Sequence, residues 1–442
     1  MKHLVTALLA CLALNAQPAP TSIAIRGAKI VPVSGPAIEK GAVVLRGGLI
    51  ESVGENVTIP ADAEVIDGTG LTVYPGLIDA LSTWGMPGVA PAAGRGGGRA
   101  GAAAAAPAAP PAKGPEDRPS TTSWIKAADE FQPNDRRIEL ARNAGFTTAV
   151  VFPTTGIFGG QGSIIDLAGD KRDDMVLEPS VGQYIAMYIG RGFGGGFPSS
   201  LMGVIAYVRQ IYLDADHYKL VKAAYEKNPR GMERPAYDRA LEGVIESKRI
   251  LLPANRWVEV QRMVKFGREL KQPTILYGMV EGFDKRSTDY LKDTPVLVSL
   301  KWPAAPRDPD PDEVETLRTL EDRAKAPTAP EALKQAGVHF AFYTDGVDQP
   351  REIQRAMKKA MDAGLSREDA VRALTLSPAE IYGVADRVGS IEKGKIANLV
   401  VTKGEIFDDR TRVEMVFIDG VKHTPTPEPP GRGGAATPER EN

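Results

Sequence analysis

Residues 389–401 read Gly-Ser-Ile-Glu-Lys-Gly-Lys-Ile-Ala-Asn-Leu-Val-Val, and this stretch carries more information about the fold than any other. Its glycines mark a turn, and the apolar run over residues 397–402 predicts a buried strand. A similar run over residues 413–418 ends in the turn dipeptide Asp419-Gly420. The chain from Gly389 to His423 is therefore expected to be β-structure.

The N-terminal part of the chain shows the same kind of pattern. Short apolar runs separated by turn residues predict strands over residues 23–25, 28–33, 42–46, 49–53 and 64–67. Gly47-Gly48 between two of these runs indicates a hairpin. We therefore expect one β-domain that is built from both ends of the chain.

Between these ends, apolar runs of strand length alternate with stretches of helical periodicity. Strands are expected over residues 148–152, 250–252, 274–277, 296–298 and 338–343. Helices are expected over residues 135–143, 207–227, 235–247, 258–270, 350–363 and 367–374. Such alternation is typical of a parallel α/β sheet or barrel.

Two segments are low in complexity. Residues 85–119 hold a Gly/Ala/Pro-rich insert, which predicts a flexible loop, and residues 424–442 predict a disordered tail. A separate glycine-rich stretch, Gly156 to Ser163, follows the predicted strand at residues 148–152. It is interpreted as a tight turn over the mouth of a candidate binding site.

The composition excludes some classes of protein. The 442 residues include 54 Lys and Arg against 56 Asp and Glu, a net charge of −2, which argues against a dedicated nucleic-acid partner. The single cysteine, Cys11, excludes an internal disulfide. The four histidines, His3, His217, His339 and His423, are few for a protein that would bind a transition metal.

The N-terminus is typical of a secretory signal peptide over residues 1–19. Lys2 and His3 precede an apolar run over residues 4–14, which is too short to span a bilayer. We expect export, to the periplasm or the extracellular space. Lipid anchoring through Cys11, in a lipobox-like Leu8-Leu9-Ala10-Cys11, is the second alternative. No other stretch predicts a transmembrane segment.

Several of these stretches resemble the amidohydrolase superfamily. Residues 73–79, Val-Tyr-Pro-Gly-Leu-Ile-Asp, resemble the entry to its first barrel strand. Residues 374–379 resemble the helix that precedes the return into its small β-domain, and residues 389–401 resemble that return. Thr344-Asp345-Gly346 is similar to the segment that carries its strand-8 aspartate. Within the superfamily, the chain resembles secreted imidazolonepropionase-like amidohydrolases.

The resemblance implies a fold and a chemistry. It implies a (β/α)₈ TIM-like barrel over residues 76–384 and a composite β-sandwich from residues 20–75 and 385–423. The active site would lie at the carboxyl ends of the barrel strands. One or two divalent metals would activate water to hydrolyse C–N bonds in amides or cyclic amides. Asp345 would be the catalytic residue that moves the proton.

The positions that match the family's metal ligands carry other residues. Leu81 and Thr83 stand where the two strand-1 histidines would be, and Tyr277 stands about where the strand-6 histidine would be. The strand-5 position falls near Pro253 or Asn255, and the strand-4 ligand has no clear match. We therefore predict no metal site, and expect zinc only if this interpretation is wrong. The predicted barrel-mouth pocket comprises Leu81, Thr83, Asn255, Arg256 and Tyr277.

The remaining histidines do not supply a substitute set. His217 is expected on a solvated helix face, His339 in the core at the far end of the barrel from Asp345, and His423 on the surface. Carboxylates near strand ends, Glu281 and Asp284 with Asp345, leave a site for a harder ion open.

Three functions follow from this pattern. The first is a pseudoenzyme that binds a small molecule at the barrel mouth or pairs with an intact amidohydrolase relative. The second is an active hydrolase of non-peptide C–N bonds that uses a reduced metal site or Asp345 as general base. The third is a structural subunit of a homo- or hetero-oligomer. The sequence leaves open whether the protein is an enzyme.

Overall fold

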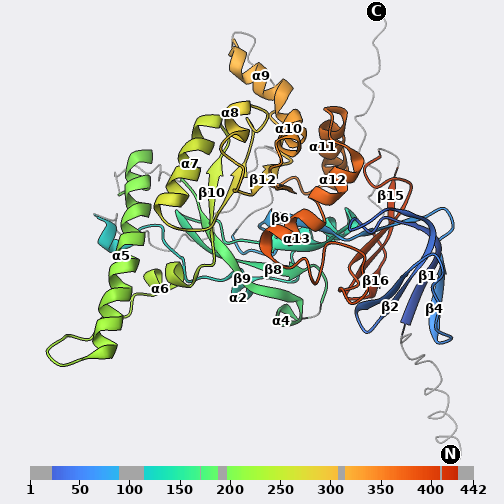
Figure 1. Cartoon of the computed structure of the whole chain (residues 1–442), viewed down its shortest axis with the longest axis horizontal. Coiled ribbons are helices and arrows are strands. Elements are labelled where there is room, and N and C mark those ends of the chain that lie inside the picture. Colours follow the sequence, from blue (N-terminus) through green and yellow to red (C-terminus); the bar gives the residue numbers. More distant parts are fainter. Residues whose placement is uncertain are drawn as a thin grey trace, which may run out of the picture.

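The computed structural model describes residues 22–88, 114–169, 171–187, 197–306, 314–408 and 411–426 (Figure 1). These residues form two eight-stranded sheets, one from the two ends of the chain and one from its middle. The first sheet makes a separate domain at one end of the molecule, and the long helix α5 (Leu201–Lys227) stands at the other end (Figure 1).

The sheet domain joins the two ends of the chain through one strand pair. β14 runs antiparallel to β5, with Leu399 opposite Pro75 and Thr402 opposite Thr72. Isoleucine, valine and leucine side chains from both ends fill its core, which confirms the predicted composite β-domain. Its strands are β1 (Ser22–Ile30), β2 (Ile38–Arg46), β3 (Leu49–Gly54), β4 (Ala63–Asp67), β5 (Thr72–Pro75), β14 (Leu399–Lys403), β15 (Arg412–Ile418) and β16 (Val421–His423).

The second sheet is a nearly closed barrel. Its strands lie in the order of the sequence, and the last strand, β13, packs beside the first, β6. They are β6 (Leu77–Ser82), β7 (Phe146–Val151), β8 (Phe158–Asp166), β9 (Val176–Ile185), β10 (Ile250–Ala254), β11 (Thr274–Gly278), β12 (Val296–Ser299) and β13 (Phe340–Tyr343). The TIM-like barrel predicted for the middle of the chain is confirmed.

One strand of the barrel runs against the others. β8 is antiparallel to both β7 and β9, whereas the other neighbouring strands pair in parallel. The interpretation of Gly156 to Ser163 as a tight turn is therefore wrong, because most of it is a buried strand. Its glycines pack closely: a Cβ on Gly162 would lie 2.2 Å from the Phe152 ring, and one on Gly159 would lie 2.3 Å from the carbonyl oxygen of Pro153.

Helices surround the barrel and follow most of the predicted ranges. Asp135 caps α3, since its side chain accepts a hydrogen bond from the N–H of Arg137 at 2.9 Å. The remaining helices are α2 (Ala127–Glu130), α3 (Arg136–Asn143), α4 (Arg172–Met175), α6 (Arg239–Glu246), α7 (Trp257–Glu269), α8 (Lys285–Thr288), α9 (Leu317–Lys325), α10 (Ala329–Gln335), α11 (Pro350–Asp362), α12 (Arg367–Ala373), α13 (Leu376–Tyr382) and the short 3₁₀ turns η1 (Pro115–Asp117) and η2 (Ala326–Thr328).

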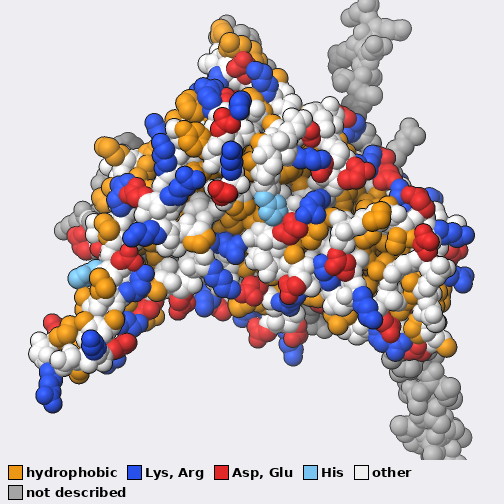
Figure 2. All heavy atoms as spheres, viewed as in Figure 1, with side chains coloured by type: hydrophobic (Ala, Val, Ile, Leu, Met, Phe, Trp, Pro, Cys, Tyr) orange, Lys and Arg blue, Asp and Glu red, His pale blue; other side chains and the backbone are white. Residues whose placement is uncertain are grey.

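Most of the low-complexity insert and the tail lie outside the described residues. At the start of the insert, Gly85 and Met86 are packed rather than flexible, because the Phe131 ring lies against Gly85 and Met86 is 5% exposed. Among the helices that the structure describes, none is long and apolar enough to cross a membrane. On the face shown in Figure 2, acidic and basic side chains are interspersed, so the two signs are not segregated there.

Candidate functional site

The carboxyl ends of the parallel barrel strands gather four of the residues that the sequence singled out. Leu81 lies near the end of β6, and Tyr277 lies in β11; both pack into the cluster that fills the barrel interior. Thr83 follows β6 directly, and Asp345 lies two residues beyond β13. These side chains therefore share one end of the barrel.

Asn255 and Arg256 also follow β10 at this end of the barrel, but their described hydrogen bonds are made by backbone groups to neighbouring elements. Both residues are exposed, and their backbone N–H groups donate to Glu259 Oε2 at 2.8 and 3.2 Å. The Asn255 carbonyl oxygen accepts from the N–H of Glu281 at 2.7 Å. Their described contacts thus fix the start of α7 and the loop after β11.

Asp345 is held in a defined position at the end of β13. Its Oδ2 accepts a hydrogen bond from Ser299 Oγ at 2.8 Å, and its backbone has a φ of +52°, a left-handed conformation that side chains other than glycine rarely adopt. The residue is accessible to solvent, yet the packed side chains around it exclude enough water to raise the pKa of its carboxyl. The Ser299 hydroxyl and the charge of Lys301 oppose this rise.

Tyrosine side chains fill the space beside Asp345. The rings of Tyr184 and Tyr277 stack with centroids 5.3 Å apart and planes at 27°. Tyr277 donates its hydroxyl proton to the carbonyl oxygen of Ile185 at 3.2 Å. Burial raises the pKa of Tyr277 and of Tyr343 well above the ordinary value, and the charge of Asp345 adds to the rise. These phenols are therefore neutral hydrogen-bonding groups, and Tyr277 is engaged in aromatic packing.

A guanidinium group also lies at the barrel mouth, next to the end of β6. Arg137, 6% exposed, donates from Nη1 to Thr83 Oγ1 at 3.2 Å and from Nη2 to the Thr83 carbonyl oxygen at 2.9 Å. Asp135 accepts from Arg137 Nε and Nη2 at 2.8 and 2.6 Å and holds the cation in place. A fixed positive charge therefore touches the position where a strand-1 metal ligand would stand.

These residues do not fit the metal that the fold family implies. Leu81 has no donor atom, the Thr83 hydroxyl is bonded to a cation, and Tyr277 is a buried neutral phenol. In the part of the chain that the structure describes, no group of three or more His, Cys, Asp or Glu residues could hold a metal ion. The carboxylates of Glu281 and Asp284 are instead paired with Arg318 and Arg286.

Asp79 closes the barrel from beneath this site. Its Oδ1 accepts from the N–H of Thr344 at 3.0 Å, and its Oδ2 accepts from Thr344 Oγ1 at 2.6 Å. The first and last barrel strands are thus tied together through two residues that the resemblance had picked out. Asp79 is fully buried, and this burial raises its pKa to about 7, with a smaller contribution from the charge of Asp348.

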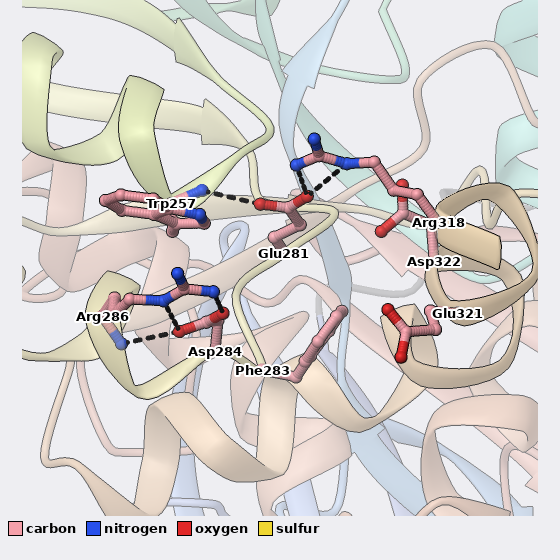
Figure 3. Close-up of a pocket in the computed structure, with 8 residues that line it drawn as sticks. All are labelled: Trp257, Glu281, Phe283, Asp284, Arg286, Arg318, Glu321 and Asp322. Atoms are coloured by element: carbon pink, nitrogen blue, oxygen red, sulfur yellow. Dashed lines mark hydrogen bonds and ion pairs between the residues drawn. The ribbon is translucent and has the colours of Figure 1, made fainter. Parts of the chain in front are cut away.

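A cavity of about 320 Å³ opens at the carboxyl ends of β10 and β11 (Figure 3). Glu281, which is 6% exposed, accepts from Arg318 Nε at 3.2 Å and from the N–H of Trp257 at 3.0 Å. The Arg286 guanidinium lies 4.3 Å from the centre of the Trp257 ring. The lining residues are Trp257, Glu281, Phe283, Asp284, Arg286, Arg318, Glu321 and Asp322.

The sequence predicts Glu281 and Asp284 near strand ends, but nothing in it indicates this cavity. Its far wall comes from α9, and the charges of Arg318 and Asp322 look like those of any solvated helix face. Trp257 follows Asn255 and Arg256 after the end of β10, and an aromatic residue there does not by itself indicate a cavity. Only the contacts of α9 with the loop after β11, from Arg318 to Glu281 and from Lys325 to Phe283, bring these walls together (Figure 3).

The histidines are distributed differently from expectation. His217 is exposed on α5, as predicted, and Asp214 pairs with Arg118. His339 lies just before β13, at the far end of the barrel, but the core-packing role is wrong, since its side chain is 44% exposed and lies 3.1 Å from Glu380 Oε2. His423 is not a surface residue: it is half-buried at the end of β16.

Comparison with known proteins places this geometry in a class. A barrel with a composite sheet domain and a strand-8 aspartate defines an amidohydrolase-type fold. A crystal structure of an amidohydrolase from Thermotoga maritima matches with a TM-score of 0.73 and 28% identity, over 91% of this chain and 100% of that chain. A Xaa-Pro dipeptidase structure matches with a TM-score of 0.53 and 16% identity, over 91% of this chain and 100% of that chain.

Sequence comparison agrees with the fold. A profile of the Amidohydrolase family matches residues 307–422. The curated protein "Amidohydrolase tasK" of Hapsidospora irregularis is 22% identical over 417 residues, which is 86% of this chain and 39% of that protein. This chain thus spans about two fifths of the length of that relative. The sequence and the fold are thus similar to those of amidohydrolases, and the imidazolonepropionase-like resemblance fits this similarity.

Proposed function

We propose that this amidohydrolase-family protein binds a small organic molecule at the carboxyl end of its barrel and does not carry out metal-dependent hydrolysis. The observation that carries the proposal is the Arg137 guanidinium bonded to Thr83, where the family motif has a metal ligand. This guanidinium, which Asp135 holds in place, occupies both oxygens of Thr83, so neither oxygen is free to ligate a divalent cation. Leu81 and the stacked Tyr277 offer no compensating ligand.

The cavity beside β10 and β11 supports the binding half of the proposal. Its volume of about 320 Å³ lies at the lower end of the range of small-molecule sites. Trp257 and Phe283 supply apolar walls, and the paired Arg318 and Glu281 supply hydrogen-bonding groups in a fixed position. Such a mixture suits a ligand with both a ring and a polar group.

Metal content tests the first half. Protein purified without chelators, and again after zinc or manganese add-back and desalting, is analysed by elemental mass spectrometry. We expect far less than one metal ion per chain, with no rise in melting temperature after add-back, because selective binding to the folded state would stabilise it. Near-stoichiometric metal whose removal by a chelator lowers the melting temperature would overturn the proposal.

A ligand screen by thermal shift tests the second half. Compounds that raise the melting temperature are retested on Trp257→Leu and Glu281→Gln, and Arg209→Ala serves as the control, since it removes an exposed ion pair with Glu269. We expect stabilisation to be lost in the two cavity variants and kept in the control. Stabilisation that survives both cavity substitutions would place the ligand elsewhere.

One observation favours the alternative of a metal-independent hydrolase. Asp345 is accessible, has a raised pKa and is oriented by Ser299, as a general base requires. Its carboxylate would take a proton from water as the water oxygen bonds to the amide carbon. The C–N bond would then break as the leaving nitrogen takes that proton.

Asp345→Asn distinguishes the two functions. A panel of cyclic amides, N-acyl amino acids and dipeptides is assayed with the native protein, Asp345→Asn and Ser299→Ala. The binding proposal expects no turnover that depends on Asp345. Turnover that falls at least about 100-fold in Asp345→Asn, and less in Ser299→Ala, would establish the hydrolase instead.

We also propose that the protein is exported, on the basis of the apolar run over residues 4–14 behind Lys2 and His3. Intact-mass measurement of the protein expressed in a bacterial host, with separation of periplasm and cytoplasm, tests this. Loss of the first 16 to 19 residues in the periplasmic fraction is the expected result. A full-length chain confined to the cytoplasm would contradict it.

A further inference from the structure

A second cavity lies where the sheet domain meets α3. It has a volume of about 270 Å³. α3 forms one wall, β15 and β16 form another, and the segment after β16 crosses it. The lining residues are Glu139, Arg142, Asn143, Val416, Lys422, His423, Thr424, Pro425 and Thr426.

The imidazole of His423 carries an unsatisfied atom in this cavity. Nε2 is buried and has no hydrogen-bond partner among the residues that the structure describes. Buried polar atoms in folded proteins are nearly always bonded, so an orphan atom on a cavity wall calls for a partner. Burial lowers the pKa of His423, and the positive charge of Arg142 lowers it further. The imidazole is therefore a neutral ring at neutral pH.

Arg142 is the second group that lacks full compensation. It donates from Nη1 to the Leu167 carbonyl oxygen at 2.9 Å, and burial lowers its pKa despite the nearby charge of Glu139. A lowered pKa on a guanidinium means that the charged form is poorly solvated. An anion at the same wall would stabilise the charged guanidinium of Arg142.

The charges that face the cavity leave room for an anion. Arg142 and Lys422 contribute two positive charges, and Glu139 contributes one negative charge. The Glu139 carboxylate accepts from Thr426 Oγ1 at 3.2 Å, and Asn143 Oδ1 accepts from the N–H of Thr426 at 3.2 Å. These two bonds tie the segment after β16 to α3 across the opening.

We propose that this cavity binds a phosphate group, either as the free ion or as the monoester of a small molecule. The two cations attract the anion, and His423 Nε2 supplies a hydrogen bond to one of its oxygens. Its lining residues are distinct from those of the cavity beside β10 and β11, and the proposal does not depend on the function proposed there.

Titration of the histidines by NMR tests this site directly. The sequence holds only four histidines, so the imidazole ring signals can be assigned by substitution. At constant ionic strength, phosphate is expected to raise the pKa of His423 by about 1, since a nearby opposite charge favours the protonated ring. His217, exposed on α5, is the internal control and should not move.

Matched variants and ligands complete the test. Lys422→Ala, an exposed position, should reduce the phosphate effect on His423, whereas Lys393→Ala, an exposed lysine elsewhere in the sheet domain, should leave it unchanged. Phenyl phosphate that acts at lower concentration than phosphate assigns the site to a monoester, and equal potency assigns it to the free ion. A His423 pKa that phosphate shifts no more than chloride does would overturn the proposal.

Discussion

At the scale of single residues, the buried carboxyl of Asp79 controls how stability depends on pH. Its pKa is raised to about 7 mainly by burial, whereas an unfolded aspartate titrates near about 4. Folding therefore takes up a proton between these two values. The contribution of this group to stability is complete below about pH 4 and is lost as the pH rises through about 7.

Asp79→Asn tests this dependence. The amide keeps an oxygen for the N–H of Thr344, and the Thr344 hydroxyl can rotate to accept from the new amide. We expect the variant to be as stable as the native protein or more so at pH 8, and slightly less stable at pH 5. Urea unfolding at both pH values measures it. A variant that loses equal stability at both pH values would show that the carboxyl is not protonated in the folded state.

At the scale of elements, Gly76 joins the sheet domain to the barrel at a point with no room for a side chain. It lies between β5 and β6, and a Cβ there would stand 2.1 Å from Thr147 Oγ1 of the buried strand β7. Two strands from different domains can be joined so closely only because glycine lacks a Cβ.

Gly76→Ala should therefore destabilise the protein by about 1–3 kcal/mol, the usual cost of overpacking a core. Gly35→Ala is the matched control, since a Cβ at that position meets no atom within 4 Å. Chemical denaturation of both variants compares them. If the two substitutions cost the same, the close approach at Gly76 has no energetic weight.

The elements also show which parts of the fold a sequence can predict. The apolar runs at residues 250–252 and 274–277 form β10 and β11. Short apolar runs that alternate with helical segments are predicted to be buried strands, and the structure confirms this here. β8 was missed because its glycines are turn residues locally. In the fold they are required by Phe152 and Pro153, which pack on them from the segment just after β7.

Some residues of the candidate site could likewise be predicted from the sequence, whereas others are brought there only by tertiary packing. Asp345, Leu81, Thr83 and Tyr277 could be placed at strand ends from their motifs alone. The Arg137 guanidinium could not, since it reaches Thr83 from the first turn of α3, far along the chain. The cavity wall from α9 could not be predicted for the same reason: its residues have ordinary surface chemistry until α9 contacts the loop after β11.

At the scale of the whole molecule, Asp166 links the barrel to the sheet domain. Its Oδ1 accepts from Thr148 Oγ1 and from Asn398 Nδ2, each at 2.8 Å, while Oδ2 is buried without a partner among the described residues. Burial, with the charge of Asp419, raises the pKa of Asp166 to about 7. Burial of the ionised carboxylate is therefore costly, although the bonds from Thr148 and Asn398 favour that form, and the net contribution of Asp166 to stability is lost as the pH rises through about 7.

Asp166→Asn should make the contact between the two domains less sensitive to pH. We expect amide hydrogen exchange in β14 and β7 to quicken between pH 6 and pH 8 in the native protein, after correction for the intrinsic effect of pH. The increase should be smaller in the variant. Asp419→Asn, which removes the neighbouring charge, should have an intermediate effect. Equal protection of the native protein and Asp166→Asn at every pH would rule out this role.

The pairing of β14 with β5 also has a consequence for synthesis on the ribosome. β5 leaves the ribosome early, but its partner, residues 399–403, emerges only after the whole barrel has been made. Until then one edge of the N-terminal strands stays open, and open strand edges are sites of aggregation. A nascent chain of this design must either fold slowly or be shielded by a chaperone until its last strands arrive.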